Sequence, residues 1–129
     1  MNALLLDTNV IIRLFRGDES VAKTVSRFAR ILISPTVIGE YKMGLDPNTA
    51  RGRIQKEQLD AFLDSVSVEV VPVTERTADF YARVYRELKD RGTPIPVNDM
   101  WIAASAIENN AVLYSHDDHF RHVPMLMRA

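Results

Sequence analysis

The stretch IPVNDMWIAAS, residues 95–105, starts a helix that is apolar on nearly every side yet carries an aspartate in its first turn. The prolines at its start restrict the approach of the backbone, and Asn98 is a suitable N-cap. We expect Trp101 and the alanines to anchor this helix in the core. A charge at the end of a buried helix needs a partner, so Asp99 points to other parts of the chain.

Short apolar segments alternate with helical patterns along the sequence. The apolar segments predict four buried strands and a fifth in the tail, at 3–6, 31–33, 68–71, 111–114 and 123–127. Helical spacing covers 19–30, 36–44, 54–66, 75–91 and 98–110, and a mobile loop is expected at 46–53. Such strands suit a sheet that is covered on both faces. We therefore predict a single domain, residues 1–129, with an α/β fold: a three-layer α/β/α sandwich around a mainly parallel sheet.

Composition limits the classes of function. The 129 residues include no cysteine, carry a formal net charge of −1, and contain no apolar run of about 18 residues. We expect a globular protein of the reducing cytoplasm, with no signal peptide and no membrane span. Two stretches, 8–30 and 42–56, are locally basic, with a net charge of +3 each. Solvated helix faces are one explanation of these charges, and contacts to a polyanion are the other.

Four acidic residues follow predicted strands or open helices at one edge of the sheet: Asp7, Glu40, Asp99 and Asp117. Ligands of an open parallel sheet bind beyond the carboxyl ends of its strands, so these carboxylates are expected to converge. Each also has a simpler explanation. Asp7 would cap a helix, Asp99 would suit a positive helix end, Asp117 would belong to a turn, and Glu40 would face solvent. These explanations do not account for the common edge.

Converging carboxylates have a distinct chemistry. They repel one another, and in a partly buried site some stay protonated unless a cation neutralises them. Oxygen ligands favour the hard cations Mg²⁺ and Mn²⁺. A cation held in this way activates water and stabilises charge on a leaving oxygen, which suits the hydrolysis of phosphodiester bonds.

Four stretches, in this order, resemble the motifs of PIN-domain ribonucleases, and more closely those of VapC toxins of toxin–antitoxin pairs: LLLDTNVII (4–12), TVIGEYKMG (36–44), PVNDMWIAA (96–104) and YSHDDHF (114–120). The resemblance covers essentially the whole chain. It implies metal-binding catalytic roles for the four acids, with Asn9 and Ser115 supporting the cluster. The family usually has Thr at the position of Ser115. Asp118 is an alternative fourth acid, but Asp117, two residues past Ser115, fits the family pattern.

The resemblance implies a Mg²⁺- or Mn²⁺-dependent endoribonuclease, the toxin of a VapBC pair, with a tRNA or rRNA loop as its target. It also implies a VapB-like antitoxin as partner and a homodimer. The candidates for contacts to RNA phosphates are basic: Arg13, Arg16, Lys42, Arg51 and Arg53. Three alternatives stay open: a PIN-like RNA-binding module, a housekeeping nuclease of RNA maturation, and a Mg²⁺-dependent phosphatase.

The segment HDDHFRH, residues 116–122, carries three histidines at spacings of three. A structural zinc site is one interpretation, but the chain has no cysteine and such histidines more often lie in an exposed loop. His116 or His119 would contact RNA phosphate or assist proton transfer if it lay near the acids. Phe120 is expected in the core.

Overall fold

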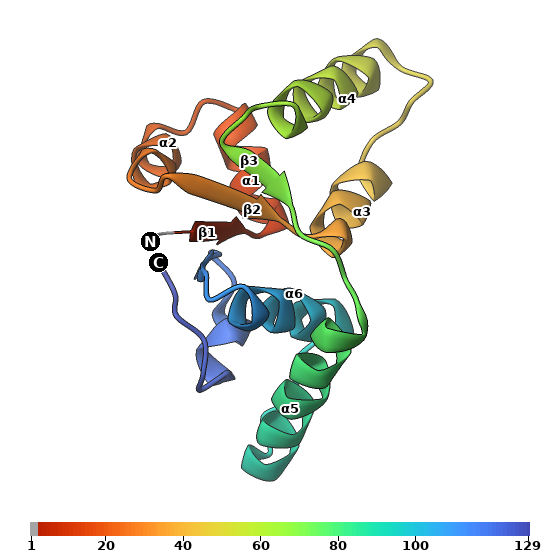
Figure 1. The fold of residues 1–129 in the computed structure, drawn as a ribbon. Helices are drawn as coiled ribbons and strands as arrows, with labels where there is room; N and C mark the ends of the chain where they lie inside the picture. Colours follow the sequence, from red (N-terminus) through yellow and green to blue (C-terminus); the bar gives the residue numbers. More distant parts are fainter. Residues whose placement is uncertain (1–2) are drawn as a thin grey trace.

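The computed structural model describes residues 3–129. Its strands are β1 (Ala3–Leu6), β2 (Arg30–Ile33), β3 (Val68–Val70) and β4 (Val112–Tyr114). They form one parallel sheet in the order β3-β2-β1-β4 (Figure 1). At its centre Leu5 pairs with Leu32 of β2 and with Leu113 of β4, and all three side chains are fully buried. β1 is buried on both faces, which explains its continuously apolar sequence. The prediction of a buried strand at 68–71 was wrong for β3, because Glu69 and Val70 are exposed at the edge of the sheet.

Within the described residues, six helices flank the sheet: α1 (Thr8–Phe15), α2 (Glu19–Ser26), α3 (Pro35–Met43), α4 (Ala50–Leu63), α5 (Glu75–Arg91) and α6 (Val97–Glu108). Figure 1 shows α5 and α6 packed together on one side of the sheet, with α1, α2 and α4 on the other. A short 3-10 helix, η1 (Asp118–His122), follows β4. The predicted three-layer α/β/α sandwich is therefore confirmed. None of the helices in residues 3–129 is both long and apolar enough to cross a membrane.

The tail does not form the predicted fifth strand. After η1 the chain turns, and a single bridge joins Arg128 to Leu113 of β4. The buried residues Phe120 and Val123 fix this segment against the core instead, and Pro124 has no N–H with which to continue a ladder. The prediction of a core position for Phe120 is confirmed, because its side chain is fully buried.

Helix boundaries differ from the sequence prediction where local caps decide them. The connection between α3 and α4 is shorter than the predicted loop at 46–53, because α4 begins at Ala50. The hydroxyl of Thr49 accepts a hydrogen bond from the Gly52 N–H and so starts this helix early. Similarly, α2 ends at Ser26, where the prediction extended the helix to residue 30.

The predicted N-cap of α6 was wrong. The helix begins at Val97 and its cap position is Pro96, which makes no side-chain capping bond. Asn98 lies in the first turn, where its amide donates to Glu40 of α3 at 3.3 Å. The prediction that α6 is a core helix is confirmed, since residues 102–106 are buried. Trp101 is half-buried and stacks on Tyr81 of α5, with ring centroids 4.1 Å apart.

The topology creates one point where the chain changes direction across the sheet. From β1 the chain moves outward to β2 and β3, and then returns on the other side of the sheet to place β4 beside β1. The backbone N–H of Asp7 donates to the carbonyl of Tyr114 at 3.0 Å, so the ends of β1 and β4 are joined. Ligands of open α/β sheets bind at such a switch point.

Candidate active site

Asp7 stands at the end of β1, and only 6% of its surface is exposed. One carboxylate oxygen accepts from the Thr8 N–H at 2.9 Å, so Asp7 does cap α1. The other oxygen accepts from the Ser115 hydroxyl at 2.6 Å, across the ends of β1 and β4. Ser115 in turn accepts from the Asp117 N–H at 3.0 Å. A single hydroxyl thus links two of the predicted acidic residues.

Glu40 is half-buried, and its carboxylate is held between two other helices. The Thr8 hydroxyl of α1 donates to one of its oxygens at 2.7 Å, and the Asn98 amide of α6 donates to the other. Sequence reasoning missed both donors, although Thr8 lies inside the D-T-N motif. It selected Asn9, which is exposed and whose side chain makes no hydrogen bond within residues 3–129. The observed hydrogen bond to Glu40 comes from Thr8, the residue before Asn9.

Asp99 and Asp117 meet at the imidazole of His119. Nδ1 of His119 lies 2.9 Å from an Asp99 oxygen and 3.0 Å from an Asp117 oxygen. One ligand atom from each residue falls within 4.8 Å of the others. Asp118 points away, with a side chain 89% exposed and 3.7 Å from Arg121. The structure therefore places Asp117 in the cluster and Asp118 outside it.

The electrostatics of the cluster favour a cation. Burial raises the pKa of Asp7, and nearby Glu40 and Asp117 raise it further, against hydrogen bonds that lower it. Burial is also the main cause of the raised pKa of Asp99; the bond from His119 opposes it, while Asp117 and Asp7 add repulsion. The hydrogen bond to Asp99 raises the pKa of His119. Carboxylates in this state are stabilised when positive charge is brought among them.

The side chains present fit a divalent cation. Carboxylate oxygens suit hard cations such as Mg²⁺ and Mn²⁺, and the imidazole adds a nitrogen donor. The three histidines do not assemble the zinc site that their spacing suggested. His116 packs edge-on against Tyr114 at 5.4 Å, and among the described residues only His119 joins a potential metal-binding group.

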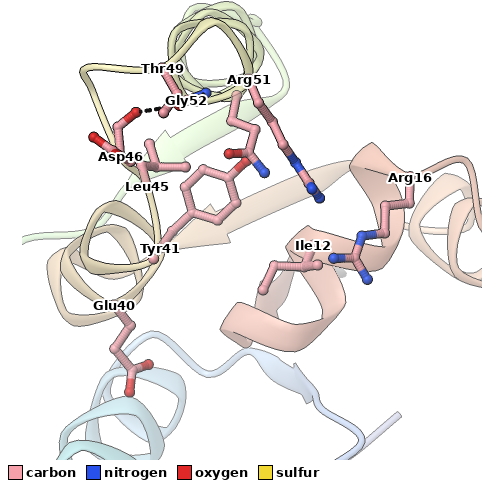
Figure 2. A pocket seen from close by; sticks show the side chains of 11 residues that line it. Ile12, Arg16, Glu40, Tyr41, Leu45, Asp46, Thr49, Arg51 and Gly52 are labelled. Carbon is pink, nitrogen blue, oxygen red and sulfur yellow. Dashed lines mark hydrogen bonds between the residues drawn. The ribbon is translucent and has the colours of Figure 1, made fainter.

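A groove opens beside the cluster, between α1, α3 and α4 (Figure 2). It comprises two adjoining cavities of about 340 and 400 Å³. Their shared lining residues are Ile12, Arg16, Tyr41, Arg51 and Gln55, and Glu40 lines the end nearest the acids. Figure 2 shows the guanidinium groups of Arg16 and Arg51 extending into the space between α1 and α4. Neither belongs to an ion pair within residues 3–129.

The wall of this groove depends on a glycine. Gly52 lies in the first turn of α4, where a Cβ would come 1.8 Å from the Asp46 carbonyl oxygen. The loop can therefore close over α4 only because residue 52 has no side chain. Arg51, the neighbouring residue, lines the groove.

The five basic candidates do not form one surface. Arg16 and Arg51 share the groove, whereas Arg13 lies 3.9 Å from Asp18 in an exposed ion pair. Lys42 and Arg53 are exposed and lie outside the groove lining. The structure thus brings two of the five candidates together, next to the acidic cluster.

Comparisons with known proteins agree with this fold and site. The sequence model of the PIN domain matches residues 4–126. Ribonuclease VapC1 of Haemophilus influenzae (strain R2866) is 32% identical over 119 residues, covering 88% of this chain and 85% of that protein. The chain therefore belongs to the PIN-domain family. Within this family it belongs to the VapC ribonucleases.

Solved structures give the same result. The chain superposes on the crystal structure of VapBC2 from Rickettsia felis bound to a promoter DNA fragment, with a TM-score of 0.86 and 25% identity; 98% of this chain and 97% of that chain are covered. VapBC-1 from nontypeable Haemophilus influenzae gives a TM-score of 0.83 and 27% identity, with 98% and 96% covered. The similarity extends over the whole domain.

Proposed function

We propose that this protein is a Mg²⁺- or Mn²⁺-dependent endoribonuclease, the toxin of a VapBC pair, which cleaves a loop of tRNA or rRNA. The observation that carries the proposal is the acidic cluster at the switch point of the sheet. Asp99 and Asp117 meet at His119. Asp7 is close enough for its charge to raise the pKa of Asp99, and Glu40 is close enough to raise that of Asp7. The name of the relatives, ribonuclease VapC, supports RNA as the substrate. The solved VapBC complexes support a VapB-type antitoxin as partner.

Asp7, Asp99 and Asp117, with Glu40 beside them, would hold the cation. Bound there, it would polarise the phosphate and activate a water molecule. The protein's own contribution is to fix the carboxylates before substrate arrives. Ser115 orients Asp7, while Thr8 and Asn98 hold Glu40 from two sides. Partners of this kind keep metal ligands oriented, which is the role we assign to Ser115.

The groove supplies a path for RNA toward the acids. A polyanion is repelled by carboxylates, so positive charge is needed close by. Arg16 and Arg51 line the same cavity as Glu40 and have no acidic partner in the described part of the chain. Guanidinium groups bind phosphate strongly. Specific RNA recognition generally reads single-stranded loops. A phosphate of such a loop would bind between the two arginines, close to the cleavage point.

The arginine contacts can be tested by salt dependence. Replacing both residues, in Arg16→Gln with Arg51→Gln, should weaken binding of tRNA about tenfold and lower the salt slope by about 1.4. Binding is measured in EDTA, so that no cleavage occurs. Arg86→Gln on the opposite side of the sheet, an exposed arginine of α5, is the matched control. An unchanged slope in the double variant would remove these residues from the RNA path.

Two alternatives make different predictions. A PIN-like binding module would hold RNA without cutting it and would not need the acidic cluster. A housekeeping nuclease of RNA maturation would share the chemistry but lack an antitoxin. The gene upstream distinguishes a toxin from such a nuclease, because a small antitoxin reading frame there supports a toxin. The homodimer and the cytoplasmic location remain predictions.

The decisive assay is cleavage of total tRNA and rRNA by purified protein with Mg²⁺ or Mn²⁺. Asp7→Asn and Asp99→Asn serve as variants, and EDTA as the metal-free control. We expect discrete fragments from the wild type alone, and mapping their ends would identify the target. Intact RNA from folded, metal-loaded protein free of antitoxin would contradict the proposal and favour a binding module.

A further inference from the structure

His119 occupies a position that the four-acid interpretation does not use. Its Nδ1 lies 2.9 Å from an Asp99 oxygen and 3.0 Å from an Asp117 oxygen. Two ligands at right angles around one cation, with bonds of about 2.1 Å, lie roughly 3.0 Å apart. Nδ1 of His119 therefore already lies at the spacing of a neighbouring ligand from each carboxylate oxygen, and all three atoms lie within 4.8 Å of one another.

The imidazole is held in this place by the backbone around it. The backbone N–H of His119 donates to an Asp117 oxygen at 2.9 Å. The next residue, Phe120, is fully buried and anchors η1. His116 has no such position, because its ring packs on Tyr114. With its hydrogen on Nε2, the ring of His119 would turn the Nδ1 lone pair toward both carboxylates without any movement.

We propose that Nδ1 of His119 is a direct ligand of the catalytic cation, together with Asp99 and Asp117, and that it biases the site toward Mn²⁺ over Mg²⁺. The inference rests on the proposed function, because it concerns the same cation. Mg²⁺ strongly prefers oxygen ligands, whereas transition-metal ions accept imidazole nitrogen. A mixed set of two carboxylates and one imidazole therefore discriminates against Mg²⁺.

The test uses Mn²⁺ itself as the probe. Electron spin echo envelope modulation of Mn²⁺ bound to the wild-type protein should show coupling to one ¹⁴N nucleus. His119→Gln should lose this coupling and about tenfold in Mn²⁺ affinity. His119→Asp replaces nitrogen by oxygen, and should abolish the coupling while lowering the ratio of Mn²⁺ to Mg²⁺ affinity. His116→Gln and His122→Gln are matched controls and should behave as the wild type.

The outcomes separate this inference from the proposed function. Mn²⁺ that needs Asp99 but shows no ¹⁴N coupling, or coupling that survives in His119→Gln, would overturn the role of His119 and leave the nuclease proposal intact. Mn²⁺ that binds Asp99→Asn and Asp117→Asn as tightly as the wild type would overturn the metal site itself, and the proposed function with it.

Discussion

The two ends of α6 hold carboxylates in opposite circumstances. Asp99, in the first turn, faces Asp7, Asp117 and His119. Glu108, the last residue of the helix, accepts one hydrogen bond of 2.6 Å from the buried hydroxyl of Thr77 in α5. A carboxylate is unfavourable at a helix C-terminus, so this hydrogen bond offsets a local cost. Glu108 fastens α5 to α6, while Asp99 meets further negative charge.

We propose that this difference separates a structural acid, Glu108, from a functional one, Asp99. The carboxylate of Glu108 accepts a hydrogen bond from a neutral donor, the Thr77 hydroxyl. Asp99 and its acidic neighbours are brought together against their mutual repulsion, which persists until a cation or a proton offsets it. Composition does not distinguish the two residues, because both are acids on one helix. Their neighbours in space distinguish them. Three experiments test this difference between acids with neutral partners and acids with acidic neighbours.

The largest effect is expected from Asp99→Asn. Loss of a charged ligand should lower ribonuclease activity more than about 100-fold, and should also abolish the rise in Tm that Mn²⁺ gives the wild type. Glu108→Gln is the matched variant at the other end of the helix and should keep activity within about twofold. Activity is measured on the mapped RNA target. Equal losses in the two variants would break the distinction between the two ends.

The opposite pattern is expected from Thr77→Val. This change removes the hydrogen bond to Glu108 and the acceptor for the Thr74 N–H, so the free energy of unfolding should fall by about 2 kcal/mol. Urea denaturation measures this loss, and the activity of the folded fraction should be unchanged. A loss under about 0.5 kcal/mol would show that Thr77 does not fasten α5 to α6.

The smallest effect concerns the stability of the metal-free protein. Folding raises the pKa of Asp7, chiefly by burial, so the folded state holds this proton more tightly than the unfolded chain. Ionisation therefore favours unfolding. The stability contributed by protonated Asp7 is lost as pH rises from the ordinary value of 3.8 through the raised pKa.

Asp7→Asn cannot ionise, so its stability relative to the wild type should increase across that window. At about pH 7 it should be more stable by about 1 kcal/mol, a common gain when a functional charge is removed. Denaturation in EDTA at about pH 4 and about pH 7 measures the difference. A difference that does not grow with pH would mean that Asp7 ionises in the folded protein without cost, which would weaken the electrostatic argument for the site.

Local patterns predicted which acidic residues come together better than they predicted the side-chain hydrogen bonds that hold them. Strand ends and turn residues identified Asp7 and Asp99, because strand and helix signals are local in sequence. The pattern did not reveal that Thr8, and not Asn9, reaches Glu40, since that bond joins residues 32 apart. Nor did it reveal that Asn98 serves Glu40 instead of capping its own helix. Such side-chain partners depend on how α1, α3 and α6 pack.

Hydrophobic periodicity and chain order were enough to predict the α/β class, the buried helix and the set of acids at one edge of the sheet. The sequence favoured Asp117 over Asp118, but only the packed structure shows that Asp118 points away from the cluster and that Arg16 and Arg51 share a groove. Tertiary structure also brought His119 to Asp99 across 20 residues of chain. The physical reason is that distances between side chains on different elements follow from packing, which no local pattern records.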